Sequence, residues 1–146
     1  MELLIDHKNI NLDQLNLMLK QTVSEQLGME VVEVGADFMV MRMPVDHRTH
    51  QPYGVLNGGA SMALAESVAS FAGNLMLPPN KFCVGLEING NHIKSIRSGW
   101  VFAKATPIHI GNKTHVWSIN ITNDKDELIC ISRMTLAVLD KPSNEK

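Results

Sequence analysis

Apolar residues recur with a helical period in the middle of the chain. At about 100° per residue, four of them fall on one face and form the stripe of a helix packed on a core: Leu64, Val68, Phe71 and Leu75. The glycine pair Gly58-Gly59 precedes the stripe, and Pro78-Pro79, which cannot continue a helix, follows it. The pattern therefore predicts one long central helix.

The first part of the chain also has helical spacing, at Leu12, Leu15, Leu19 and Val23. Asn11 and Gln14 have the spacing of a capping box, so we expect a helix from Asn11 to about Gly28. From Met29 to Met43 the pattern becomes typical of two short strands joined by a turn at residues 35–37.

Everything after the long helix has the alternation of β-strands. The expected strands are Phe82–Ile93, Trp100–Ile110, His115–Thr122 and Leu128–Leu139. One long helix among runs of strands predicts an α+β fold, with a mostly antiparallel sheet and the helix packed on one face. We expect a single domain over residues 1–146, with an N-terminal helical segment (1–28) and a frayed tail (141–146).

Composition excludes several classes of protein. The chain is 45% hydrophobic with a formal net charge of −2, which excludes a disordered tail and gives no electrostatic case for binding nucleic acid. No apolar run reaches the roughly 20 residues of a membrane span, and the first ten residues carry charges where a signal peptide is apolar. Neither a membrane nor a nucleic acid is an expected partner.

Cysteine and histidine spacing gives no metal site. Cys83 and Cys130 lie in apolar runs without a CxxC spacing, which indicates reduced core residues of a cytoplasmic protein. His47 and His50 form a loose HxxH with no further ligand at metal spacing. We expect neither metal nor cofactor.

Glu66 lies on the second face of the long helix, among small residues and one methionine: Gly59, Met62, Ala63, Ala69, Ser70 and Gly73. Most helical glutamates are solvated. However, the chain has no lysine, arginine or aspartate from Gln51 to Leu77, whereas a solvent-facing helix normally carries several charges. A buried or interfacial functional carboxylate is therefore the favoured interpretation.

Three segments in this order carry a family resemblance: MPVDHRTHQPYGVLNGGASMALAESVAS, VGLEINGNHIKS and SRMTLAVL. The chain resembles the hotdog-fold acyl-CoA thioesterases from about residue 29 to 138, especially the branch that hydrolyses aromatic esters such as hydroxybenzoyl-CoA and dihydroxynaphthoyl-CoA. The resemblance implies a curved sheet around the central helix. It also implies a homo-oligomer, a dimer or a dimer of dimers, with active sites at the protomer boundary.

The resemblance assigns roles in thioester hydrolysis. Glu66 matches the catalytic carboxylate, which attacks the carbonyl or activates a water. The N–H of Gly58 would polarise the carbonyl oxygen, because only glycine lets an acyl group come so close. Gln51 matches a glutamine that orients the thioester or the water, from the protomer opposite Glu66. Ser67 and Ser70 match polar positions near the carboxylate; as isolated helical serines they would be packing residues.

The resemblance also implies a coenzyme A site. The matching positions are Gly85, His92, Ile93, Lys94, Ser95, His109, Ile110, Gly111, Asn112, Lys113 and Thr114. Lys94 and Lys113 are suitable partners for phosphates, and the turn at Gly111-Asn112 is expected to offer N–H donors. Without the family, Lys113 is only a lysine in a hairpin turn.

Asn57 departs from the family motif, which has histidine before the glycine pair. Asparagine can donate a hydrogen bond but cannot titrate near neutral pH. It is expected beside the thioester, as a natural variant, an engineered substitution or a sign of weakened activity; the local alternative is a favoured Asn-Gly turn. The missing histidine argues against a hotdog dehydratase and keeps open an acyl-CoA-binding module without turnover.

Overall fold

The computed structural model describes residues 5–143. They contain a short 3-10 turn, η1 (His7–Asn9), and three α-helices, α1 (Leu12–Leu17), α2 (Val23–Gln26) and α3 (Gly58–Leu75). The strands are β1 (Glu30–Val34), β2 (Met39–Val45), β3 (Lys81–His92), β4 (Gly99–Ile110), β5 (Thr114–Asn123) and β6 (Leu128–Asp140). They form one antiparallel sheet in the order β1-β2-β4-β5-β6-β3.

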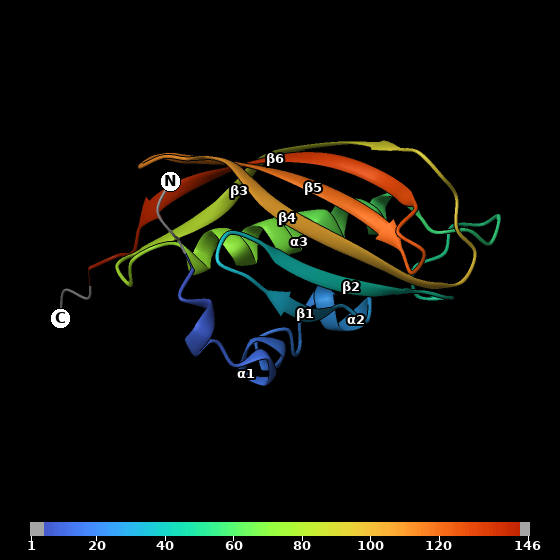
Figure 1. Cartoon of the computed structure of the whole chain (residues 1–146), viewed down its shortest axis with the longest axis horizontal. Coiled ribbons are helices and arrows are strands. Elements are labelled where there is room, and N and C mark those ends of the chain that lie inside the picture. Colours follow the sequence, from blue (N-terminus) through green and yellow to red (C-terminus); the bar gives the residue numbers. More distant parts are fainter. Residues whose placement is uncertain (1–4, 144–146) are drawn as a thin grey trace.

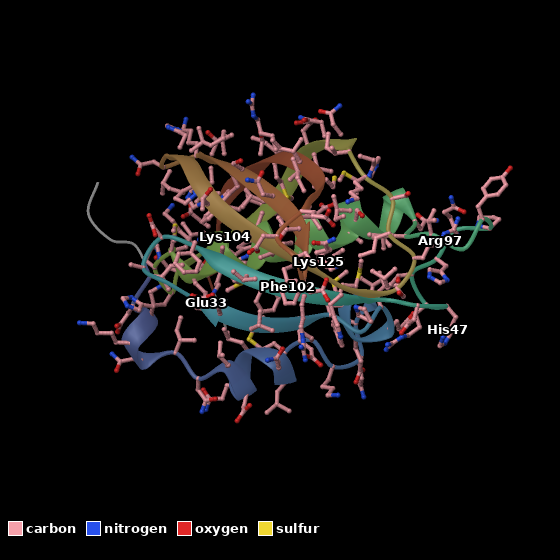
Figure 2. The ribbon with its side chains drawn as sticks, turned by 45° about the vertical axis from the view of Figure 1, so that its right-hand side comes forward. Glu33, His47, Arg97, Phe102, Lys104 and Lys125 are labelled. Carbon is pink, nitrogen blue, oxygen red and sulfur yellow. The ribbon has the colours of Figure 1, made fainter. Side chains whose placement is uncertain are left out.

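The sheet curves over α3, which lies along its concave face (Figure 1). Alternate side chains of the strands point inward and are fully buried against the helix, among them Met41, Ala103, Ile119 and Met134. The outer face carries charged groups such as Glu33 and Lys104 (Figure 2). The expected α+β hotdog architecture is confirmed.

The two cysteines belong to this core, as predicted. Cys83 and Cys130 are buried and unpaired. Burial raises the pKa of the Cys83 thiol to about 11 and also raises the pKa of Cys130. Both thiols are therefore protonated at neutral pH and act as small apolar side chains.

The N-terminal helical segment is not one helix. Asn11 caps α1 as predicted, because its Oδ1 accepts from the N–H of Asp13 at 2.9 Å and of Gln14 at 3.3 Å. The helix then ends at Leu17, and Gln21 has φ of 60°, outside the right-handed helical region. Val23 consequently begins a separate helix and is 58% exposed rather than part of a continuous stripe.

Some small residues of α3 let the helix pack closely against the sheet, in addition to those expected around Glu66. Ala69 and Gly73 were expected on the face of Glu66, but both are buried against the sheet. A Cβ on Gly73 would lie 2.6 Å from Cδ1 of Leu136 and 3.0 Å from Sγ of Cys83. Glycine is therefore required where α3 meets β3 and β6.

β3 is an edge strand, and its apolar alternation points away from the core. Val84 is 41% exposed and Leu86 is 62% exposed. Cys83 and Gly85 point to α3 instead, and a register shift follows Gly85. The sheet thus presents one long unpaired edge with apolar side chains.

Candidate active site

The first turn of α3 has one N–H group without an acceptor among the described residues. Asn57 caps the helix, since its Oδ1 accepts from Gly59 N–H at 2.7 Å and from Ala60 N–H at 3.3 Å. The N–H of Ser61 donates to the carbonyl oxygen of Asn57 at 3.2 Å. The Gly58 N–H, at the positive end of the helix dipole, is left available for a ligand.

Gly58 lines a cavity of about 340 Å³ between the start of α3 and the end of β3. The lining residues are Gln51, Leu56, Gly58, Ser61, His92, Ile93, Lys94, Ser95 and Ile129. The imidazole of His92 lies over Gly58, with Nε2 only 2.9 Å from where a Cβ would stand. The cavity brings together Gln51, Gly58 and residues 92–95, which the sequence placed in one site.

Gln51 is held by its own loop. Its backbone N–H donates to the carbonyl of Val55 at 2.8 Å, and its Oε1 accepts from the N–H of Tyr53. The side-chain oxygen is therefore occupied, while the amide nitrogen of Gln51 has no partner among the described residues. That nitrogen can donate to a ligand in the cavity.

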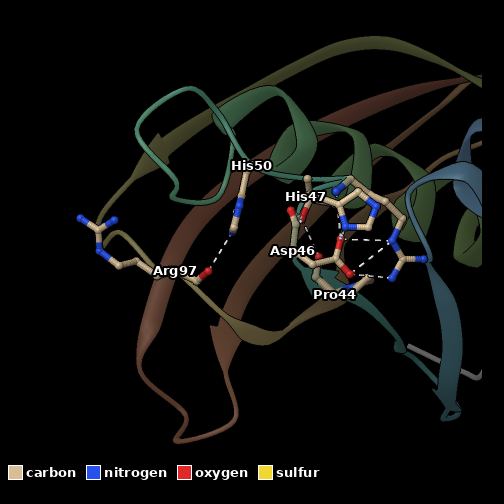
Figure 3. Close-up of polar contacts among 7 residues, drawn as sticks. Pro44, Asp46, His47, His50 and Arg97 are labelled. Carbon is tan, nitrogen blue, oxygen red and sulfur yellow. Dashed lines mark hydrogen bonds and ion pairs between the residues drawn. The ribbon is translucent and has the colours of Figure 1, made fainter.

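The segment before Gln51 is fixed by polar contacts (Figure 3). The Thr49 hydroxyl donates to the Pro44 carbonyl at 2.7 Å, and a nitrogen of His50 lies 2.8 Å from the Arg97 carbonyl oxygen. Hydrogen bonds from Arg48 lower the pKa of Asp46 to about 2, so this pair is ionised at neutral pH. These contacts make a rigid support for the cavity wall.

Asn57 is placed differently from the sequence expectation. Its side-chain oxygen is occupied by the cap, and the residue borders another cavity, of about 240 Å³, with Arg48, His50 and Gly59. Asn57 is therefore the N-cap of α3, in extended conformation, rather than part of the Asn-Gly turn that was the local alternative. Only its amide nitrogen is left for a substrate.

Glu66 lies further along α3, where its carboxylate faces β3. Its Oε1 is 2.7 Å from the point that a Cβ of Gly85 would occupy, so glycine at that position makes room for the carboxylate. Glu66 is exposed in the isolated chain, so of the two expected settings, buried or interfacial, only the interfacial one fits this position. Ser67 and Ser70 are half-buried on the same helix.

Apart from Gly85, which lies beside Glu66, the expected coenzyme A residues fall at the two ends of the molecule. Residues 92–95 lie near the start of α3, where Lys94 Nζ is 2.5 Å from Glu127 Oε1 and lowers the pKa of that carboxyl. Residues 109–114 form the β4–β5 turn beyond the other end of α3 (Figure 1). Within one chain these two groups do not form one site.

The β4–β5 turn offers fewer donors than expected. The N–H of Gly111 donates to the Thr114 carbonyl at 2.9 Å, so it is not available. Gly111 and Asn112 border a cavity of about 230 Å³ with the C-terminal end of α3. Lys113 is exposed, as a turn lysine should be.

Sequence reasoning missed two buried polar residues. Ser61 lines the cavity at Gly58, and its position one helical turn later could have revealed it. His115 is fully buried in β5, and neither ring nitrogen has a partner within residues 5–143. Burial, and to a smaller extent the neighbouring His109, lowers the pKa of His115. No sequence signal distinguished His115 from other strand residues.

The described residues show no group of three side chains suited to a metal ion, and none of their helices is long and apolar enough to cross a membrane. The family model of the thioesterase superfamily matches residues 53–130. The chain belongs to this superfamily.

Relatives of known name support this membership. The chain is 43% identical, over 132 residues, to the 1,4-dihydroxy-2-naphthoyl-CoA hydrolase of Escherichia coli, covering 90% of this chain and 97% of that one. It is 39% identical to the proofreading thioesterase EntH of Cronobacter turicensis, covering 90% of this chain and 96% of that one. A thioesterase structure from Haemophilus influenzae superposes with a TM-score of 0.92 at 43% identity, covering 99% and 100% of the two chains. The expected activity, hydrolysis of an acyl-CoA thioester, is confirmed at the level of the family.

Proposed function

We propose that this protein hydrolyses acyl-CoA thioesters that carry an aromatic acyl group, with Glu66 as the catalytic carboxylate. The observation that carries the proposal is the unbonded Gly58 N–H in a cavity shared with Gln51. A free amide at a helix start is a suitable donor to the oxygen of a thioester carbonyl. The aromatic preference is supported by relatives named for 1,4-dihydroxy-2-naphthoyl-CoA.

The active site is proposed to contain residues of two protomers. Glu66 follows Gly58 by eight positions, about 12 Å along a helix, so one chain cannot bring both groups to the same carbonyl. The exposed Leu86 and the unpaired edge of β3 lie beside Glu66, and they suit pairing with a second copy. Glu66 of one protomer would then face Gly58 and Gln51 of the other.

In the proposed reaction, the Gly58 N–H and the Gln51 amide hold the thioester while the Glu66 carboxylate acts on its carbonyl carbon. Two routes remain. In one, Glu66 forms an anhydride as the C–S bond breaks and thiolate leaves, and water then hydrolyses the anhydride. In the other, Glu66 takes a proton from the attacking water. Both end in a free acid and coenzyme A.

Coenzyme A is proposed to contact residues from both ends of α3. This is possible because each active site of the dimer contains residues of two chains. Residues 92–95 of one protomer and residues 109–114 of the other supply candidate contacts, including Lys94 and Lys113 for phosphates. The two unpaired cysteines suit a cytoplasmic enzyme. No cofactor is part of this proposal.

The test is a panel of acyl-CoA esters with a thiol reagent that reports released coenzyme A. Wild-type protein should turn over aromatic esters fastest, and Glu66→Gln should lower kcat by about 10²–10⁴-fold while leaving the fold intact. The nearly isosteric amide retains packing but loses the negative charge. Near-normal turnover by Glu66→Gln would remove the carboxylate from the mechanism. Tight binding without turnover by the wild type would instead favour the acyl-CoA-binding module.

A further inference from the structure

Ser61 is a buried residue, and its hydroxyl makes no hydrogen bond within residues 5–143. The residue is 1% exposed, and the small part that remains accessible faces the cavity at Gly58. A helical serine commonly donates to the carbonyl four residues earlier, which here belongs to Asn57. That carbonyl accepts the backbone N–H of Ser61 but not its hydroxyl. A hydroxyl without a protein partner at the wall of a cavity is free to donate to a bound ligand.

The direction of the side chain supports this interpretation. Side chains on a helix lean toward its N-terminus, so a residue covers the turn that precedes it. Ser61 stands three positions after Gly58, on the same side of α3, and both residues line the same cavity. Because Gly58 has no side chain, nothing on that residue separates its N–H from the Ser61 hydroxyl.

We propose that the Ser61 hydroxyl is a second hydrogen-bond donor, beside the Gly58 N–H, to the oxygen of the substrate's thioester carbonyl. This inference rests on the proposed function. As the carbonyl carbon becomes tetrahedral, its oxygen gains negative charge, and both donors bind that charge more strongly than the neutral carbonyl. The serine keeps its proton throughout, so it stabilises the oxyanion without acting as an acid.

Ser61→Ala removes only the hydroxyl. It should lower kcat by about a hundredfold, the loss typical of one oxyanion donor, and leave KM and the melting temperature little changed. The matched control is Ser24→Ala, which also removes a buried hydroxyl but lies in α2, outside the cavity. This control should retain the turnover of the wild type.

A spectroscopic measurement separates hydrogen bonding from packing. In the inactive Glu66→Gln background, a bound acyl-CoA with a ¹³C-labelled carbonyl should show a lowered C=O stretching frequency. Adding Ser61→Ala should raise that frequency again. If Ser61→Ala does not fold, Ser61→Cys tests the same donor, because it retains a side chain of similar shape with only a weak donor.

Two results would overturn the inference while leaving the proposed function standing. One is a kcat of folded Ser61→Ala, or of Ser61→Cys in its place, within about twofold of an active wild type. The other is a C=O frequency that does not respond to the loss of the hydroxyl. A wild type that hydrolyses none of the acyl-CoA esters would contradict the proposed function and this inference together.

Discussion

Gly85, on the edge strand β3, lies next to the carboxylate of Glu66, the proposed catalytic group. Its lack of a side chain leaves space for the Glu66 carboxylate and for the Cε atom of Met134, each 2.7 Å from the position of a Cβ. A methyl group on residue 85 would displace the Glu66 carboxylate from its position against β3. The residue that the family resemblance gave to substrate binding thus also has a structural reason to be glycine.

We therefore expect Gly85→Ala to lower kcat by about a hundredfold, since a displacement of about 1 Å in a catalytic group can have that effect. The matched control is Gly90→Ala on the same strand, where the added Cβ would meet only the flexible end of Met62 and a more distant carbonyl. Steady-state kinetics on the preferred ester would compare the two. Equal activity of both variants would mean that the carboxylate does not need this position.

His115 is a residue whose effect should appear in the pH dependence of stability. Its pKa is lowered in the folded protein, so the unfolded chain binds the proton more readily. The free energy of unfolding should therefore be highest above the unfolded pKa of about 6.5 and should fall as the pH decreases below it. Urea unfolding between pH 7.5 and 5 measures this loss.

His115→Phe is the variant that isolates this effect. It replaces two unpartnered polar atoms by apolar ones in a fully buried position, so it should reduce the slope of stability against pH. His47→Phe is the control, because His47 is exposed and lies 4.0 Å from Asp46 on the surface. An unchanged slope in His115→Phe would show that other groups cause the pH dependence.

At the scale of elements, the start of α3 depends on its cap. Asn57→Ala should lower the free energy of unfolding by about 1 kcal/mol, because two N–H groups lose their acceptor. Asn57→Asp retains an oxygen acceptor and should retain stability in the same denaturation experiment. If Asn57→Ala were as stable as wild type, the cap would contribute nothing.

The same pair of variants tests whether Asn57 also acts on substrate. Asn57→Asp keeps the cap but removes the amide donor. A normal melting temperature with reduced kcat would assign a donor role to the Asn57 nitrogen. Unchanged kcat in Asn57→Asp would leave Asn57 with its structural role alone.

Helices and strands could be predicted from the sequence where a single strong hydrophobic periodicity defines them. The stripe from Leu64 to Leu75 and the stop at Pro78 give α3, and the turn at 111–113 separates β4 from β5 as expected. The break between α1 and α2 was missed because it depends on the positive φ of Gln21, a residue type that ordinarily continues a helix. Which face of β3 meets the core could not be predicted, because alternation does not reveal which side of a strand is buried.

Like the elements, the candidate site could be predicted from the sequence only where local rules determine it. Residues near one another in sequence, such as Gly58 and the cap at Asn57, follow from local rules. The approach of His92 to Gly58 and of Glu66 to Gly85 depends on how β3 crosses α3, which only the fold determines. The separation of residues 92–95 from residues 109–114, at opposite ends of α3, also depends on the fold.

At the scale of the whole molecule, one chain holds the two parts of the proposed thioesterase site far apart. Gly58, Gln51 and Ser61 lie at the start of α3, whereas Glu66 lies about 12 Å further along it. The exposed apolar edge of β3 lies beside the second part. A dimer that joins these edges would explain both the separated groups and the exposed side chains.

The most direct test is complementation between two inactive variants, Gln51→Ala and Glu66→Gln, co-expressed with different tags and purified through both. Each mixed dimer should contain one intact site and one site with both substitutions, so a co-expressed pool should recover about a quarter of the wild-type activity, and doubly purified dimers about half. Each variant alone, prepared in the same way, is the control and should stay inactive. Mixed dimers as inactive as the single variants would contradict a site shared between protomers.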